Sequence, residues 1–151
     1  MKQNNHIRTF GSFSFFKNIE YIKNTASGAV IFSNNKAYFI KERSYYIVNY
    51  LCIKHLTSLN GYNDAVKNIF NYYRNIPVVL NDNLILIYTN SLKDYHNIFI
   101  NFSNINEINK VKDGLLITFK SGNNLTVEIS LNYYRSQLKR INKIITYLNI
   151  I

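Results

Sequence analysis

The sequence is poor in cysteine, proline, tryptophan and acidic residues. It contains one cysteine, one proline, no tryptophan and eight acidic residues. The single cysteine, Cys52, excludes an internal disulfide framework and a cysteine-rich zinc module, and it fits a reducing cytosol. No apolar run approaches the roughly 18 residues of a membrane span. Polar side chains interrupt residues 1–17 too often for a signal peptide. We therefore expect a cytoplasmic protein that does not enter a membrane.

The scarcity of acidic residues gives the chain its charge. Eighteen Lys and Arg against eight Asp and Glu leave a formal net charge of +10, and the sequence pI is about 9.7. Apolar residues make up 47% of the 151 residues, which is enough for a core and excludes a disordered basic tail. We expect residues 18–151 to form a single domain, preceded by a loosely ordered lead-in at residues 1–17.

Asparagine is unusually frequent. The chain contains 25 Asn, and Asn, Ile, Tyr and Lys together make up 73 of its residues. All four residue types have A/T-rich codons, so we attribute their number to coding bias rather than to a functional asparagine tract. We assign no chemistry to the asparagines.

Short runs of β-forming residues appear early in the chain. Residues 28–32 and 37–40 are predicted strands, and Ser33–Lys36 between them is a plausible hairpin connection. Residues 45–48 are predicted to add another strand.

Apolar residues then recur at helical spacing, and Asn60 and Gly61 interrupt the pattern. This spacing predicts two short helices, at about residues 50–59 and 62–73. The only proline, Pro77, marks the end of the helical stretch, because proline disfavours a helical conformation at the residue before it.

Beyond the proline, short β-rich runs alternate with turn residues such as Asp113–Gly114. The connections are too short for crossover helices, which favours an antiparallel sheet. We predict an α+β fold with a mainly antiparallel, curved sheet and a helical insert at about residues 50–73. The predicted strands are residues 77–80, 84–88, 98–102, 115–119 and 125–129.

The last segment is the clearest helix, at about residues 131–148. Ser130 is well placed to cap its first turn. The helix is expected to cover one face or one open end of the sheet, an arrangement analogous to pleckstrin-homology-like domains. Six apolar residues lie on one stripe of the helix: Leu131, Tyr134, Leu138, Ile141, Ile145 and Leu148. Four basic residues lie mostly off this stripe: Arg135, Lys139, Arg140 and Lys143.

Residues that could support catalysis or metal binding are few. His6, His55 and His96 lie far apart in the sequence. Cys52 and His55 are three residues apart on a predicted helix, and a zinc site would need about two further ligands. A Cys52–His55 nucleophile and base pair remains an alternative to a buried thiol and a surface histidine. We predict no enzymatic activity, no cofactor and no metal site.

The positive charge indicates a binding protein. A basic folded domain is typical of proteins that bind phosphate backbones, where Lys and Arg displace condensed counterions. Ribosomal and membrane-surface proteins share this property. Charge alone therefore leaves nucleic acid as one option among several.

The order of landmarks from Cys52 onward resembles the ComK family of competence transcription factors. In that family a cysteine segment leads to a glycine, followed by an alanine four residues later and a lysine two residues beyond. Ten residues after that lysine comes a proline. The likeness covers roughly residues 45–140, and the matching residues are Cys52–Gly61, Ala65, Lys67, Ile76–Val79, Ile87–Ser91, Ile98–Ile100, Ile117–Gly122, Ile129–Ser130, Gln137 and Arg140.

The resemblance implies a cytoplasmic transcriptional activator of competence and DNA-uptake genes. Such a protein binds A/T-rich boxes in double-stranded promoter DNA through the minor groove, as a homodimer or higher assembly, and works with the transcription machinery. It implies DNA contacts by four residues in and just after the helical insert: Lys54, His55, Lys67 and Arg74. The Tyr62 hydroxyl could contact a phosphate or could serve in packing.

The chain departs from the family pattern at several positions. The Arg-Ser that usually precedes the cysteine is Tyr50–Leu51, and the basic pair after the glycine is Tyr62–Asn63. A second proline and its lysine are missing around Asn75–Ile76. Family members tend to continue with a tail that a proteolytic adaptor reads. Because this chain stops at Ile151, we do not expect control by such an adaptor.

These departures keep a second hypothesis open. The chain could be a diverged relative that does not bind DNA and instead binds a protein partner, or a full-length regulator, through its sheet edge. Stronger binding to an A/T-rich duplex than to a G/C-rich one distinguishes the first hypothesis from the second.

Overall fold

The structure is a computed structural model that describes residues 18–150, with the side chain of Ile150 excepted. The predicted lead-in at residues 1–17, with His6, lies outside the described residues. The described chain contains three α-helices and nine β-strands, and every strand pair is antiparallel. The predicted α+β class is therefore confirmed.

The strands form two sheets rather than one. The larger sheet has six strands in the order β3-β2-β1-β6-β5-β4, so β1 lies in the interior although it comes first in the chain. Its strands are β1 (Ile19–Thr25), β2 (Gly28–Ser33), β3 (Lys36–Ile40), β4 (Val78–Asn81), β5 (Leu84–Tyr88) and β6 (Ile98–Asn101).

The smaller sheet has three strands in sequence order. They are β7 (Ile105–Val111), β8 (Gly114–Phe119) and β9 (Asn124–Val127), and the 3₁₀-helix η2 (Phe102–Asn104) connects them to β6. The two described sheets close no barrel. The analogy to pleckstrin-homology-like domains therefore extends only to a sheet that a C-terminal helix covers.

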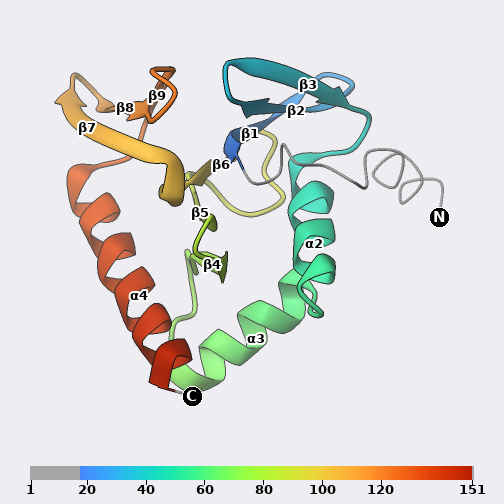
Figure 1. Cartoon of the computed structure of the whole chain (residues 1–151), viewed down its shortest axis with the longest axis vertical. Helices are drawn as coiled ribbons and strands as arrows, with labels where there is room; N and C mark the ends of the chain where they lie inside the picture. The colour runs from blue at the N-terminus through green and yellow to red at the C-terminus, as the bar shows by residue number, and fades with distance from the viewer. Residues whose placement is uncertain (1–17, 151) are drawn as a thin grey trace.

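The helices lie on opposite sides of the central strands (Figure 1). The helical insert consists of α2 (Ser44–Lys54) and α3 (Leu59–Phe70), and the C-terminal helix is α4 (Leu131–Ile150). In Figure 1, β4 and β5 lie between α4 on the left and the two insert helices on the right. No helix among residues 18–150 is long and apolar enough to cross a membrane.

The central strand β5 shows how the core is divided. Its five residues, Leu84–Tyr88, are all buried. Alternate side chains of a strand point to opposite faces. Leu86 accordingly packs with Ile47 and Leu51 of α2, whereas Ile87 belongs to the cluster that contains Ile141 of α4. The larger sheet is therefore covered on both faces, and a strand that is buried on both faces is a continuous apolar run.

The predicted hairpin at Ser33–Lys36 is confirmed. Strands β2 and β3 pair directly, with Ser33 opposite Lys36. The two residues between them, Asn34 and Asn35, have φ angles of 50° and 66°. Two consecutive left-handed residues are the requirement of a type I′ turn, and asparagine tolerates that conformation well.

Several predicted boundaries were wrong. Residues 45–48 lie in α2, not in a strand. Asn60 and Gly61 belong to the first turn of α3 instead of separating two helices. The second insert helix ends at Phe70, because Asn71 adopts a left-handed conformation with φ of 58°, so its end does not depend on Pro77.

Two strands were missed by the sequence analysis. Strand β1 contains Glu20 and Asn24, which are both buried. Their polarity hides the strand in a hydropathy pattern. Strand β7 has only half-buried or exposed residues, so its apolar side chains give a weak signal.

Candidate functional site

Two of the predicted site residues lie where α2 ends. Lys54 is the last residue of the helix and is exposed, with its ammonium nitrogen 5.8 Å from the centre of the Tyr50 ring. His55 follows it at the C-terminal cap. The sequence of α2 contains no acidic residue.

Both ring nitrogens of His55 are engaged inside the protein. Its Nδ1 donates to the carbonyl oxygen of Leu51 at 2.8 Å, and its Nε2 accepts from the side-chain amide of Asn81 at 3.0 Å. The ring therefore connects the end of α2 to the last residue of β4. In this arrangement His55 fixes the position of Lys54 and offers no free ring nitrogen to a ligand.

The other two predicted residues lie at the far end of α3. Lys67 is half-buried in the last turn, and Arg74 is exposed in the loop that follows. Together with Asn63, Ser91 and Tyr88 they line one open hollow of about 490 Å³. Beside the apolar Ile76 and Leu92, the lining combines two cations with amide and hydroxyl groups, which suits a phosphate or another anion.

The loop that carries Arg74 is held by α4. The guanidinium of Arg140 stacks 4.4 Å from the centre of the Tyr72 ring and donates to the carbonyl oxygens of Arg74 and Asn75. Gln137, which is buried, donates to the Asn75 carbonyl oxygen at 2.8 Å. These two α4 residues position the loop and leave the Arg74 side chain exposed.

The four residues therefore form two pairs rather than one cluster. Lys54 and His55 precede α3, whereas Lys67 and Arg74 lie at and beyond its end. A helix of 12 residues is about 18 Å long at 1.5 Å per residue. This is about five steps of a DNA strand at roughly 3.4 Å each.

The residue after Gly61 does not serve as a phosphate contact. The Tyr62 hydroxyl donates to the Pro77 carbonyl oxygen at 2.8 Å and accepts from the backbone amide of Val79 at 2.9 Å. Burial raises the pKa of Tyr62, so the group stays protonated at neutral pH. Of the two roles considered for Tyr62, the structure supports packing.

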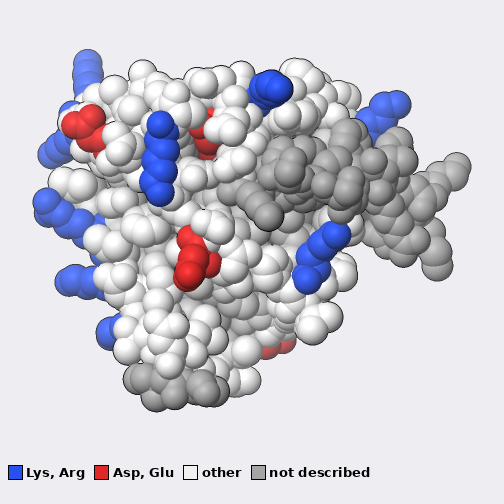
Figure 2. Space-filling view, in the orientation of Figure 1, with Lys and Arg blue, Asp and Glu red and all other residues white. Residues whose placement is uncertain are grey.

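A basic row on α4 was seen in the sequence but left out of the predicted site. Arg135, Lys139 and Lys143 are exposed and four residues apart, so they lie along one side of the helix. The 20 residues of α4 include no acidic residue. Figure 2 shows Lys and Arg side chains along the edge where α4 and the three-stranded sheet lie in Figure 1. The i, i+4, i+8 spacing of these basic residues in the sequence was the signal that could have identified this row.

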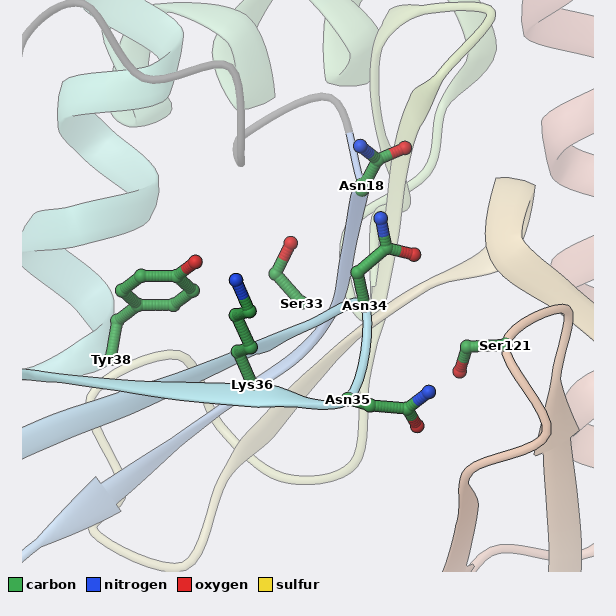
Figure 3. A pocket seen from close by; sticks show the side chains of 7 residues that line it. All are labelled: Asn18, Ser33, Asn34, Asn35, Lys36, Tyr38 and Ser121. Atoms are coloured by element: carbon green, nitrogen blue, oxygen red, sulfur yellow. The ribbon is translucent and has the colours of Figure 1, made fainter.

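The hollow around the β2–β3 turn is different in character. It is lined by Asn18, Asn34, Asn35 and Ser121 among other residues, and Lys36 is the charged side chain among the described residues that line it. Figure 3 shows that Asn35 and Ser121 approach it from the β2–β3 turn and from the turn before β9. Amide and hydroxyl groups with one cation give this hollow little attraction for a polyanion.

The Cys52–His55 pair lacks the properties of a nucleophile and base. Cys52 is fully buried, and burial raises the pKa of its thiol to about 11. A thiol of that pKa is protonated at neutral pH, whereas the thiolate is the reactive form. Within residues 18–150 no group of three or more His, Cys, Asp and Glu side chains could hold a metal ion.

Comparison with known proteins gives a match to a protein family. The sequence profile of the ComK protein family matches residues 18–150, nearly the whole chain and all of its described part. No curated protein and no solved structure matches the chain significantly. The ComK family is a family of transcription factors and not of enzymes. The match over residues 18–150 therefore shows that this chain belongs to the ComK family of competence-related transcription factors.

Proposed function

We propose that the protein is a cytoplasmic activator that binds A/T-rich boxes in promoters of competence and DNA-uptake genes through the minor groove. The observation that carries this proposal is the family match over residues 18–150. The net charge of +10 supports it, because neutralising phosphates supplies much of the affinity of DNA-binding proteins. On DNA, the protein would act as a homodimer or higher assembly and would work with the transcription machinery.

The proposed contacts use both ends of α3. Lys54 at one end and Lys67 with Arg74 at the other would neutralise phosphates about five steps apart, given the helix length of about 18 Å. His55 would contribute by fixing the end of α2 through its bonds to Leu51 and Asn81. The hollow that Lys67 and Arg74 line would receive one phosphate.

Binding in the minor groove agrees with basic side chains at both ends of α3. A/T-rich tracts have a narrow minor groove, whose negative potential attracts Lys and Arg. The groove mainly distinguishes A·T from G·C pairs, so a protein with few base contacts can still prefer A/T-rich boxes. Phosphate contacts would then set the register, and groove shape would supply the preference.

The test is a comparison of two labelled duplexes of equal length. One carries an A-tract and a T-tract box, and the other has a G/C-rich sequence. We expect tighter binding to the A/T-rich duplex, measured by fluorescence anisotropy at several salt concentrations. Equal and weak binding to both duplexes would refute the proposal.

A second function is favoured by the exposed edge of the larger sheet. Within the described chain, strand β3 pairs only with β2, and its Phe39 is 73% exposed. An unpaired edge with an exposed aromatic side chain can accept a strand from a protein partner. Size-exclusion chromatography with candidate regulators in the absence of DNA tests this alternative, and co-elution that Phe39→Ala abolishes would support it.

A further inference from the structure

The end of α2 is built as a Schellman motif with an unusual residue at its centre. The backbone amide of Leu56 donates to the Ile53 carbonyl oxygen at 3.0 Å, and that of Thr57 donates to the Cys52 carbonyl oxygen at 3.2 Å. These two bonds define the motif, and they place Leu56 at the position that adopts the left-handed conformation. Glycine usually occupies this position because it has no Cβ to strain.

Leu56 is an exception within its own chain. Among residues 18–150, six residues other than glycine have positive φ angles, and five of them are Asn or Asp, which tolerate the left-handed region. Leu56 is the sixth, with φ of 65°. The chain therefore places suitable residues at its other strained positions and a leucine here.

The side chain of Leu56 does not pack against the rest of the fold. It is 97% exposed, so it contributes no packing that would offset the backbone strain. A residue in a sparsely populated backbone region costs on the order of 1–3 kcal/mol and points to a function when nothing in the fold accounts for it. The exposure of this apolar side chain to solvent is a second unfavourable feature at the same position, in addition to the backbone strain.

The surrounding loop holds Leu56 in a fixed place. His55 connects to Leu51 and to Asn81, and the backbone amide of Leu59 donates to the Asn49 side chain at 2.9 Å. These hydrogen bonds on both sides of Leu56 restrict the motion of the tip of the insert. A rigid, protruding apolar side chain is suited to insertion into a partner.

We propose that Leu56 is a wedge that enters the minor groove and partly unstacks one base step of an A/T-rich duplex. The inference rests on the proposed DNA-binding function and adds the mode of insertion to it. Minor-groove proteins insert apolar side chains, leucine among them, between base pairs and kink the duplex. TA steps are easily unstacked whereas A-tracts are stiff, so we expect the wedge at a TA step of the A/T-rich duplex and not within an A-tract.

The neighbourhood of Leu56 favours DNA over a protein partner. Lys54 lies two residues away, and α2 itself contains no acidic residue, while the exposed Asp82 follows Asn81, the partner of His55, in the turn after β4. The apolar surface at this tip is also small, because among residues 18–150 the exposed large apolar side chains there are Leu56 and the half-exposed Ile53. A stable protein interface needs about 800 Å² from each partner, far more than these two side chains offer.

The experiment places 2-aminopurine at successive positions of the A/T-rich duplex and records its fluorescence on binding. With the natural protein we expect a rise at one step, because unstacking removes the quenching of the probe. In Leu56→Gly we expect the rise in fluorescence to disappear. The affinity should fall by roughly tenfold, because a kinked duplex contacts more of the protein surface than a straight one does. The melting temperature of this variant should be equal or higher, because glycine relieves the strain.

Two further variants make the result specific. Leu56→Asn tolerates the left-handed conformation and lacks the apolar side chain, so it should behave as Leu56→Gly does. Phe39→Ala removes another exposed apolar side chain, at the distant sheet edge, and should leave the fluorescence change intact. Loss of the signal in this control would contradict a specific role of Leu56.

The outcomes separate the two proposals. If the natural protein does not prefer the A/T-rich duplex, the proposed function fails. If it does prefer that duplex, but no position of the probe brightens and Leu56→Gly binds equally well, the wedge is overturned while the function stands. If the Leu56 variants lose a protein partner and keep DNA binding unchanged, the wedge is likewise overturned.

Discussion

At the scale of single residues, polar side chains in the interior hold the fold together. Asn101 is fully buried, and its amide donates to the carbonyl oxygens of Ile19 and Asn83, each at 2.9 Å. Its side-chain oxygen accepts from the backbone amide of Ile85 at 3.1 Å. The number of asparagines fits a coding bias, but the position of this one joins three segments. Composition could not distinguish it from the surface asparagines.

The Tyr62 hydroxyl is a second such group, and Tyr62→Phe tests it. The substitution leaves the buried Pro77 carbonyl and the Val79 amide without their partner. We expect the free energy of unfolding to fall by about 1–3 kcal/mol, which is typical for an unsatisfied buried group. Urea denaturation followed by circular dichroism measures this change.

Tyr73→Phe is the matched control, because Tyr73 is 70% exposed. Its free energy of unfolding should stay within about 0.5 kcal/mol of the natural protein. Equal stability of Tyr62→Phe and Tyr73→Phe would contradict the structural role of the Tyr62 hydroxyl.

At the scale of elements, the C-terminal helix agrees best with its sequence. The predicted cap is confirmed, since the Ser130 hydroxyl accepts from the backbone amide of Tyr133 at 3.0 Å. The predicted apolar stripe is largely correct, although Leu148 is 54% exposed. The helix also buries Gln137, which a hydropathy pattern assigns to the polar side.

The cap gives a prediction for α4. We expect Ser130→Ala to lower the free energy of unfolding by about 1 kcal/mol, because a backbone amide of the first turn loses its acceptor. Thermal or urea unfolding of the purified protein measures the loss. Ser136→Ala, an exposed position within the same helix, serves as the control and should be neutral or slightly stabilising. Equal losses in both variants would argue against the cap.

The helical insert shows the limit of local propensity. Residues 45–48 are Tyr, Tyr, Ile and Val, which favour strands, yet they form the first half of α2. Ile47 and Val48 are fully buried against the larger sheet. Burial on one side of a helix therefore outweighs a β propensity that spans about 1 kcal/mol.

At the scale of the whole molecule, exposed Lys and Arg side chains occur on several elements, and two regions are candidates for DNA contacts. One region is the insert, with Lys54, Lys67 and Arg74, and the other is the exposed side of α4. The two regions need not contribute equally to DNA binding. The dependence of affinity on salt distinguishes them, because it counts the phosphates that are neutralised.

We expect the double variant Lys54→Ala, Lys67→Ala to bind the A/T-rich duplex more weakly. Its plot of log affinity against log salt should be shallower by about 0.9 for each phosphate that the variant no longer neutralises. Anisotropy titrations between low and physiological salt measure the slope.

The control variant Lys23→Ala, Lys36→Ala removes the same charge from exposed positions on the larger sheet. If both double variants change the slope equally, the insert has no special role in binding. An unchanged slope in the insert variant would instead direct attention to Arg135, Lys139 and Lys143.

The sequence by itself determined the features that depend on near neighbours. The hairpin at Asn34–Asn35, the cap at Ser130 and the span of α4 follow from turn chemistry and helical spacing within a few residues. The antiparallel arrangement follows from short connections, and the net charge of +10 is a property of composition. The order of landmarks was sufficient to indicate the ComK family.

Only the tertiary structure decided which distant residues meet. It placed β1 in the interior of the larger sheet, divided the strands into two sheets, and separated the predicted site into pairs at the two ends of α3. It also brought Gln137 and Arg140 against the loop of Arg74, more than sixty residues earlier in the chain. Such contacts depend on how apolar faces are buried together, and a local pattern of residues does not encode that pairing.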